Sequence, residues 1–493
     1  MKSYRLWAIV LLLVGTACEF SVASGGEETG GKPNIVFILA DDLGWYDLGC
    51  YGNRFIETPH IDRLAADGMR FTDGYAPAAL CVPSRAGMAL GQAPARLHLT
   101  NNPSANRDKA GSPVTPVACP NPFVATSPAI AEPLKKAGYT TGIVGKWHVD
   151  RWTLAGAPDR HGFDVAVGNP SHYSQVRGSD ESARHDLIRN GIPGGEPYAV
   201  DLLTDRAIEF LEDHHEEPFF LYFSHFAVHI PLLARTEKIA KYQEKAKSYE
   251  PEEGELVNPH YAAMVESVDD SVGRILETLR RLKVDDNTVV VFFSDNGGLA
   301  TTYHASGHQE ELEARGNGCY TQFVPATSNG PLRLGKGYLY EGGIREPCLV
   351  KWPGVTRPGS VCRTPVVGYD FYPTFCEIAG QNVSEVQLDG LSLCPLLKDA
   401  NASLDRDAIC WHFPHFSNED SRPSSAIRVG RWKLIEHLEY GKVELYDLEE
   451  DLGETVNLAG RMPERTKDLK KRLDAWRKDV DAAMPTPWAT TKP

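Results

Sequence analysis

Residues that can bind a cation, neutralise an anion or transfer a proton occur at four points of the chain, each directly after an apolar run. In chain order they are Asp41-Asp42, Lys146-Trp147-His148, His225 with His229, and Asp295-Asn296. Carboxylate and amide oxygens are hard ligands that suit Ca²⁺ or Mg²⁺ better than zinc, for which the sequence holds no close cysteine or histidine pair beside them. Lysine and histidine beside such a cation supply positive charge and proton transfer near neutral pH.

The four apolar runs predict strands buried on both faces of a sheet, because short continuous apolar runs are typical of parallel strands covered by helices. They are Asn34 to Ala40, Thr141 to Val144, Pro218 to Ser224 and Thr288 to Ser294. The helices predicted between them run from Thr58-Pro59 to near Gly68, from Ser127-Pro128 to Gly138, and along an apolar stripe from Met264 to Leu279. This alternation indicates an α/β sandwich.

The four polar segments are expected to converge, because ligands of open α/β sheets bind beyond the carboxyl ends of the strands. Each segment also has a structural alternative when it is taken alone. Asp41-Asp42 suits a helix cap or a turn, His148 suits an ordinary surface position, and Asp295-Asn296-Gly297-Gly298 suits a turn. Their shared position after strands favours one common site.

A further candidate is the run Cys81-Val82-Pro83-Ser84-Arg85, which is followed by Gly91. Pro83 suits the first turn of a helix, so the chain after Cys81 is expected to present backbone N–H groups to a bound anion. Arg85 would then lie close to Cys81. The alternative is a structural cysteine, buried or in a disulfide, beside a chance Pro-Ser-Arg.

This run resembles the maturation signature of the type I sulfatases, Cys-x-Pro-Ser-Arg with a glycine six residues further on, in which the cysteine is oxidised to formylglycine. The resemblance covers about residues 33 to 460, with the family's phrases in order: NIVFILADDLGW, CVPSRAG, GYTTGIVGKWH, AVHIP, FFSDNGG, GPLRLGKGYLYEGGIREP and ELYDLEEDLGETVNLA. The chain thus resembles arylsulfatase-like enzymes of the alkaline phosphatase superfamily, and bacterial carbohydrate sulfatases in particular. The implied fold is an alkaline-phosphatase-like sandwich, with a large mixed, mainly parallel sheet flanked by helices.

The resemblance implies a divalent cation, Ca²⁺ with Mg²⁺ as the alternative, and a formylglycine at Cys81. A hydrated aldehyde carries two hydroxyls on one carbon, so that one oxygen attacks sulfur and the other later expels sulfate. The metal ligands carried over from the family are Asp41, Asp42, Asp295, Asn296 and the modified Cys81.

The resemblance also implies roles for the catalytic side chains. Arg85 would stabilise the hydrated aldehyde, and Lys146 and Lys336 would hold sulfate oxygens. His148 would pair with the second hydroxyl of the hydrate, while His229 would protonate or bind the leaving ester oxygen. If the family phrase around it is disregarded, Lys336 is interpreted as an ordinary exposed turn lysine between two glycines.

The substrate is less well defined by the sequence. Trp411-His412-Phe413-Pro414-His415 combines aromatic and histidine side chains, as a loop that recognises sugar could, with Trp411, His412 and His415 as contacts. The alternative is a structural β-turn with a packed tryptophan. The resemblance and the predicted export favour a sulfated glycan as substrate.

The formal net charge of −15 over 493 residues argues against a nucleic-acid partner and offers no polybasic membrane footprint. An anionic substrate therefore needs a local cluster of cations. Residues 301 to 330 are polar without clear periodicity and suggest a long active-site loop.

The N-terminus has the pattern of a secretory signal, with Lys2 and Arg5, the apolar stretch Leu6 to Val14, and small residues that end at Ala23. Cys18 makes a lipoprotein anchor the less favoured alternative. Export to the periplasm or the medium is therefore expected, without stable membrane insertion after cleavage. Maturation of Cys81 would require a formylglycine-generating enzyme as a partner.

The predicted organisation has four parts: a signal peptide (1–23), a flexible N-terminus (24–32), a catalytic domain (33–400) and a C-terminal subdomain (401–493). The subdomain is expected to be α+β with an antiparallel sheet. Its predicted elements are strands at Ser425 to Val429, Trp432 to Glu436 and Val443 to Tyr446, and a helix from Leu469 to Val480.

Two other functions are compatible with parts of the sequence. A formylglycine-dependent phosphonate or phosphate ester hydrolase would use the same nucleophile and cation. A noncatalytic glycan-binding protein would keep Cys81 as a thiol, but Lys146, His148, His229 and Lys336 argue against it. The favoured function is hydrolysis of a sulfate ester.

Overall fold

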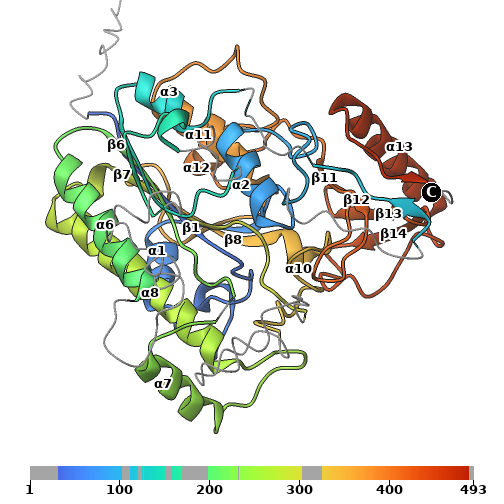
Figure 1. Cartoon of the computed structure of the whole chain (residues 1–493), viewed down its shortest axis with the longest axis horizontal. Coiled ribbons are helices and arrows are strands. Elements are labelled where there is room, and N and C mark those ends of the chain that lie inside the picture. The colour runs from blue at the N-terminus through green and yellow to red at the C-terminus, as the bar shows by residue number, and fades with distance from the viewer. Residues whose placement is uncertain are drawn as a thin grey trace, which may run out of the picture. The chain divides into compact units, whose positions relative to one another are not determined.

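The apolar runs form neighbouring strands at the centre of one sheet. The computed structural model in Figure 1 describes residues 31–102, 112–119, 125, 127–149, 158–168, 198–230, 232–301 and 325–487. Strand β1 (Asn34–Ala40) lies between β6 (Phe219–Ser224) and β7 (Thr288–Ser294), and β4 (Thr140–Gly145) pairs with β6. All of these pairs are parallel. Every residue of β1, β6 and β7 is buried, which explains their continuous apolar sequences.

The described strands of this sheet follow the order β10-β2-β8-β7-β1-β6-β4-β5, and β9 also pairs with β2. Only β8 runs antiparallel to its neighbours, so the prediction of a mixed, mainly parallel sheet is confirmed within the described residues. The additional strands are β2 (Met69–Tyr75), β5 (Val165–Val167), β8 (Arg345–Lys351), β9 (Ser360–Cys362) and β10 (Val366–Val367).

Helices cover both faces of the sheet (Figure 1). One face carries α1 (Pro59–Asp67), α6 (Ala199–His214) and α8 (Pro259–Arg281), with α7 (Thr236–Ala246) packed against α8. The other carries α2 (Cys81–Leu90), α3 (Ala131–Lys136), α11 (Phe371–Ile378) and α12 (Cys394–Lys398). Shorter elements are α10 (Glu341–Ile344) and the 3-10 turns η1 (Gly49–Tyr51), η2 (Pro158–His161), η3 (Asp285–Asn287) and η4 (Gly368–Asp370).

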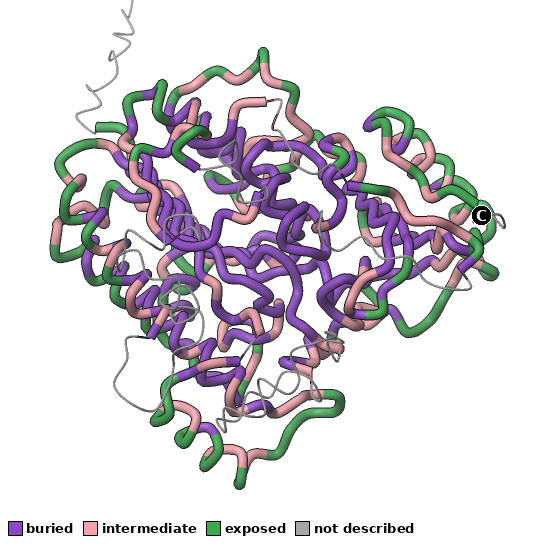
Figure 2. Tube along the Cα trace, in the orientation of Figure 1, coloured by how far each residue is buried: buried purple, intermediate pink, exposed green. Residues whose placement is uncertain are grey.

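Strand β1 contributes to two apolar cores, because successive side chains of a strand point to opposite faces. Phe37 packs on the α11 side, where its ring contacts Phe371 and Phe375. Ile38 faces the core that also contains Val268 of α8. Figure 2 shows buried residues along the strands and exposed residues on the outer turns of the helices.

The C-terminal part contains the antiparallel sheet that the sequence predicts. Its strand order is β11 (Ile409–Phe413), β12 (Ser424–Val429), β13 (Trp432–His437), β14 (Lys442–Asp447), and α13 (Pro463–Asp479) packs on it. A small ribbon joins β3 (Val114–Thr115) to β15 (Thr486–Pro487). The terminal helix starts six residues earlier than predicted, because Pro463 suits its first turn. The boundary near residue 400 stays a prediction.

One sequence-based interpretation was wrong: Trp411, His412 and Phe413 were expected in a loop, but they belong to β11. The strand pairs along its whole length with β12, and every residue in it is buried. The histidine and the following proline concealed the strand, because polar residues and proline are uncommon in the interior of a buried sheet.

Buried ion pairs join the C-terminal sheet to α10. The fully buried Lys433 of β13 lies 2.8 Å from a carboxylate oxygen of Glu341 and 2.9 Å from one of Glu454. Glu341 also accepts hydrogen bonds from Tyr75 and Arg345, at 2.7 and 2.6 Å. Because α10 closely follows Lys336, the C-terminal sheet supports a segment of the candidate site.

Several predictions fall outside the described residues, wholly or largely. They are the signal peptide, the site at Cys18, residues 24–30 of the N-terminal segment, and residues 302–324 of the predicted active-site loop. The described cysteines are all unpaired. In the described part of the chain, no helix is both long enough and apolar enough to cross a membrane.

Candidate active site

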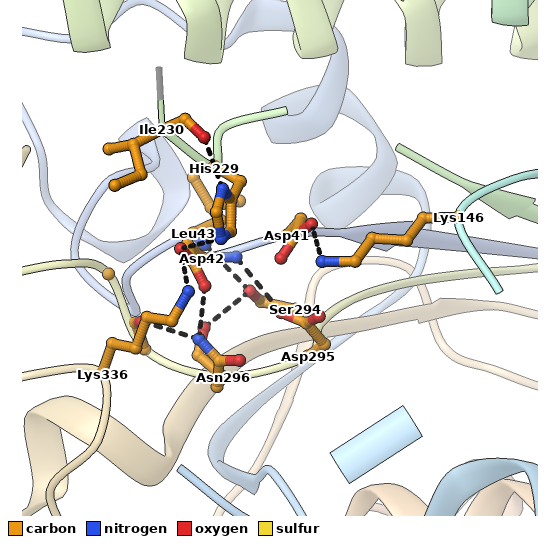
Figure 3. Close-up of polar contacts among 12 residues, drawn as sticks. Asp41, Asp42, Leu43, Lys146, His229, Ile230, Ser294, Asp295, Asn296 and Lys336 are labelled. Carbon is orange, nitrogen blue, oxygen red and sulfur yellow. Dashed lines mark hydrogen bonds and ion pairs between the residues drawn. The ribbon is translucent and has the colours of Figure 1, made fainter. Parts of the chain in front are cut away.

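The carboxyl ends of β1 and β7 bring the predicted acidic residues together (Figure 3). Asp41 and Asp42 follow β1, and Asp295 follows β7. One carboxylate oxygen from each of the three residues lies within 4.8 Å of those of the other two. All three side chains are buried. The positions of Asp41-Asp42 and Asp295-Asn296 directly after strands therefore correctly predicted that the two segments lie together.

The parallel register of the two strands explains this arrangement. Ala40 and Ser294 are paired, so the next residues of both strands emerge side by side. The N–H of Asp295 donates to the carbonyl of Ala40 at 3.1 Å, and the N–H of Asp42 donates to Oδ1 of Asp295 at 3.2 Å. Asp42 and Asp295 are thus positioned by backbone as well as side-chain hydrogen bonds.

Two buried lysines approach Asp41 and Asp42 from opposite sides (Figure 3). Lys146, which follows β4, donates to Oδ2 of Asp41, and Lys336 donates to Oδ2 of Asp42 at 2.7 Å. Burial raises the pKa of Asp41, but the charge of Lys146 and other nearby cations outweighs it, so the net shift is downward. The pKa of Asp42 is likewise lowered, because Lys336 and His229 outweigh the effect of burial.

Arg85 connects α2 to the strand ends. Its fully buried guanidinium donates from Nε to Oδ2 of Asp295 and from Nη1 to Oγ of Ser224, both at 2.6 Å. Nη1 also donates to the carbonyl of Lys146 at 2.8 Å. Nη2 lies 3.9 Å from Asp41 and has no hydrogen-bond partner among the described residues, so it can still bind another acceptor.

Cys81 is the first residue of α2, as the position of Pro83 predicts. The N-cap residue Leu80 makes no side-chain hydrogen bond to this helix, so its first N–H groups are not capped by that residue. Burial raises the pKa of the Cys81 thiol, although Lys146 and Lys336 oppose that rise. The N–H of Gly337 donates to the carbonyl of Ala79 at 2.8 Å, which joins the Lys336 segment to the start of α2.

His229 lies in the chain that follows β6, and its side chain approaches Asp42. Its Nδ1 lies 2.6 Å from the carbonyl of Ile230, which can only accept, so Nδ1 carries the hydrogen. The other ring nitrogen, Nε2, lies 3.7 Å from Oδ2 of Asp42, and about a third of the side chain is exposed (34%). Burial and Lys336 lower the pKa of His229.

The two remaining histidines at strand ends differ in their surroundings. His148 is half-buried with a φ of 52°, an uncommon conformation for a residue other than glycine. Burial, followed by the charge of Lys146, lowers its pKa well below the ordinary range. His225 is fully buried and lies 3.3 Å from Oγ of Ser271 in α8, away from the acidic residues.

The donor set fits a hard divalent cation. Oδ1 of Asp41 and Oδ1 of Asn296 are buried and have no hydrogen-bond partner among the described residues. Asn296 uses its amide nitrogen instead, which donates to Oδ1 of Asp42 at 2.7 Å. Two buried oxygens without partners are costly unless a ligand binds them. Oxygen donors of this kind suit Ca²⁺ or Mg²⁺.

The three predicted sugar-binding residues have partners within the fold. Trp411 donates to the carbonyl of Ala76 at 2.9 Å. The ring nitrogens of His412 lie 2.7 Å from Oγ of Ser425 and 2.8 Å from the carbonyl of Ala483. His415 is buried, with Nε2 2.7 Å from Oγ1 of Thr100. These contacts favour a structural role within and beside β11, although not the β-turn that was the alternative, and the recognition role stays a prediction.

Replacing His412 by alanine is expected to reduce the stability of the protein rather than its substrate choice. Ser425 and Ala483 would each lose one hydrogen bond, which costs about 1–3 kcal/mol for the two together, and the melting temperature should fall. Hydrolysis of aryl and glycan sulfates should change by the same factor. His60→Ala, at an exposed residue of α1, is the control. An unchanged melting temperature with a selective loss on glycan sulfate would instead support the recognition role.

The sequence analysis did not single out two serines that support the site. Ser224 accepts from Arg85, and Ser294 accepts from the N–H of Leu43 at 3.1 Å. Both are the last residues of their strands, β6 and β7. That position was the signal that could have identified them.

The family profile described as Sulfatase matches residues 33–381. The chain belongs to the sulfatase family. A second profile, N-sulphoglucosamine sulphohydrolase C-terminal, matches residues 333–479. Membership makes the protein a sulfuric ester hydrolase with the alkaline-phosphatase-like fold.

This sulfatase is similar to other sulfatases over nearly its whole length. It is 32% identical to a sulfatase of Formosa agariphila, covering 97% of this chain and 94% of the relative. It is 31% identical to human arylsulfatase A, covering 96% of this chain and 92% of that enzyme. The solved structure of Ps i-CgsB in complex with k-i-k-neocarrahexaose has a TM-score of 0.71 and 29% identity, covering 94% of this chain and 96% of that one.

Proposed function

We propose that this sulfatase hydrolyses a sulfate ester of a carbohydrate at the cluster around Asp41, with a nucleophile formed from Cys81. The observation that carries the proposal is the charge composition of the cluster. Three carboxylates, from Asp41, Asp42 and Asp295, face three cations, from Lys146, Lys336 and Arg85. These charges cancel, so a bound divalent cation would leave the site positive and suited to an anionic group.

The cation would be held by Asp41, Asp42, Asp295 and Asn296 beside residue 81, with Ca²⁺ proposed and Mg²⁺ as the alternative. When bound, it would neutralise charge on the sulfate oxygens as a Lewis acid. The oxygens of Asp41 and Asn296 without partners support this assignment.

The cationic side chains bind and orient the substrate in this proposal. Lys146 and Lys336 bind sulfate oxygens, because both ammonium groups are buried beside Cys81. Arg85 stabilises the hydrated aldehyde at residue 81 through its Nη2, and it also holds Asp295 in place. The N–H groups at the start of α2 add positive electrostatic potential there.

The histidines carry protons. The Ile230 carbonyl holds the hydrogen on Nδ1 of His229, so Nε2 faces the site and can deliver a proton to the leaving ester oxygen. His148 is assigned to the second hydroxyl of the hydrated aldehyde, where it assists the release of sulfate. Formylglycine at position 81 would supply that pair of hydroxyls.

The carbohydrate assignment is supported by the relatives. Ps i-CgsB was solved with k-i-k-neocarrahexaose, an oligosaccharide. We further propose that the chain is exported through a signal peptide at residues 1–23, matured by a formylglycine-generating enzyme, and divided into a catalytic domain (33–400) and a C-terminal subdomain (401–493).

Purified protein, coexpressed with a formylglycine-generating enzyme, is expected to release sulfate from an aryl sulfate and from at least one sulfated oligosaccharide. The measurement is ion chromatography of sulfate across defined sulfated oligosaccharides, with matched phosphate and phosphonate esters alongside. Faster cleavage of a phosphonate ester than of every sulfate ester would contradict the proposal. Tight glycan binding without turnover would instead indicate a noncatalytic role.

A further inference from the structure

We propose that Glu419 is a specificity-determining residue, which selects a sulfated sugar with neutral hydroxyls beside the ester and excludes one with a second sulfate or a carboxylate there. The inference rests on the proposed function. Glu419 lies in the segment between β11 and β12, more than eighty residues after Lys336 in the sequence.

The Glu419 carboxylate is packed against the segment that presents Lys336. A β-carbon built on Gly337 would lie only 3.2 Å from Oε2 of Glu419 and 3.1 Å from Oγ of Ser417. Gly337 also has a φ of 87°, a conformation that favours glycine, and a larger residue would have to displace these side-chain atoms. Glu419 is 4% exposed, so its carboxylate has little room to move away from the segment that presents Lys336.

Hydrogen bonds hold the main chain of Glu419 in this position. The hydroxyl of Tyr338 donates to the carbonyl of Glu419 at 2.7 Å. The N–H of Glu419 donates to Oγ of Ser417 at 3.1 Å, and Ser421 bonds to the same oxygen at 2.7 Å. Within the described residues, the segment is thus positioned without any hydrogen bond to the carboxylate of Glu419.

Among the described residues, the Glu419 carboxylate has no hydrogen-bond or ion-pair partner, whereas Lys336 bonds to Asp42. The negative charge of Glu419 acts on Lys336 all the same. In a site for an anionic ester, such a charge weakens the binding of sulfate. The carboxylate oxygens are not among the buried atoms that lack a partner, so they keep some access to solvent. A carboxylate that opposes sulfate binding and bonds to nothing among the described residues is accounted for by a partner on the substrate.

The chemistry of that partner follows from the acceptor. A carboxylate accepts hydrogen bonds from neutral hydroxyls, of which a sugar has several, and it repels a second sulfate or a uronic carboxylate. Rejection by an unfavourable charge is a common source of specificity. Glu419 would therefore distinguish a singly sulfated neutral sugar from a disulfated one, while a small aryl sulfate would not reach it.

The test compares kcat/KM of wild type and Glu419→Gln on two matched substrates, a monosulfated sugar and the same sugar with a second sulfate on the adjacent carbon. Wild type should prefer the monosulfated sugar, and the variant should reduce that preference by about tenfold or more. Turnover of a small aryl sulfate should not fall, because the variant removes only a charge that opposes sulfate binding. Asp420→Asn, which removes an exposed charge from the same segment, should leave the preference unchanged.

Two outcomes would overturn the inference about Glu419 without contradicting the proposed function. One is wild type that cleaves both sugars equally well, a result that needs no variant and so does not depend on its folding. The other is a variant that loses activity on all three substrates by the same factor, as a purely structural residue would. Wild type that releases no sulfate from either sugar or from the aryl sulfate would overturn the proposed function together with the inference.

Discussion

Replacing Cys81 by serine or alanine is expected to lower sulfatase activity by about 10³-fold or more, because the residue supplies the proposed nucleophile. Neither substituent can form the two hydroxyls of a hydrated aldehyde. Serine has nearly the shape of cysteine, so Cys81→Ser should leave the melting temperature within a few degrees of wild type. Turnover of an aryl sulfate, measured together with thermal unfolding, checks both parts of the expectation.

The matched control is Cys50→Ser, the same substitution at a cysteine outside the site, and it should retain full activity. Mass spectrometry of the peptide that contains Cys81 gives a second readout. The matured peptide should be lighter than the thiol form by exchange of sulfur for oxygen and loss of two hydrogens. Full activity of protein whose Cys81 is entirely thiol would contradict the mechanism.

The central sheet and the acidic part of the site could be predicted because local sequence determines both. A run such as Thr288 to Ser294 is apolar throughout, since both faces of β7 are buried, and this makes the strand and its end easy to recognise. The polar residue after such a strand must then lie at the carboxyl edge of the sheet. For this reason, the sequence correctly predicted that Asp41 and Asp295 lie close together.

Other parts of the site depend on contacts between distant segments, which no local pattern encodes. Lys336 does not follow any of the described strands directly, and only its family phrase indicated a role. Its segment is held by the bond from Gly337 to Ala79 and, through α10, by Lys433. The burial of Glu419 beside Gly337 likewise results from how the C-terminal sheet packs, not from the sequence near either residue.

His412 of β11 shows why residue types alone do not decide a role. Histidine next to tryptophan suggested sugar recognition, but the buried strand satisfies His412 with Ser425 and Ala483. A polar side chain in a strand can serve the fold as well as a ligand, and only its partners distinguish the two roles.

Removal of the divalent cation is expected to abolish turnover while leaving the protein folded. The structure explains the second part, because Lys146 and Lys336 pair with Asp41 and Asp42 and compensate their buried charge. Chelated enzyme should therefore show a cooperative unfolding transition. Calcium or magnesium should restore activity better than zinc, because the donors are oxygens. Equal activity after exhaustive chelation, verified by elemental analysis, would refute the site.

Asp42→Asn separates loss of the cation from loss of catalysis. It removes one charged ligand, so calcium affinity measured by titration calorimetry should fall by at least about tenfold. In wild type, calcium at about 100 times its Kd should add about 2.7 kcal/mol of stability, seen as a higher melting temperature. The same calcium concentration should stabilise Asp42→Asn much less, while Asp213→Asn, an exposed acid of α6, should respond like wild type. An undiminished calcium response in Asp42→Asn would place the cation elsewhere, because a carboxylate that contributes no binding energy is not its ligand.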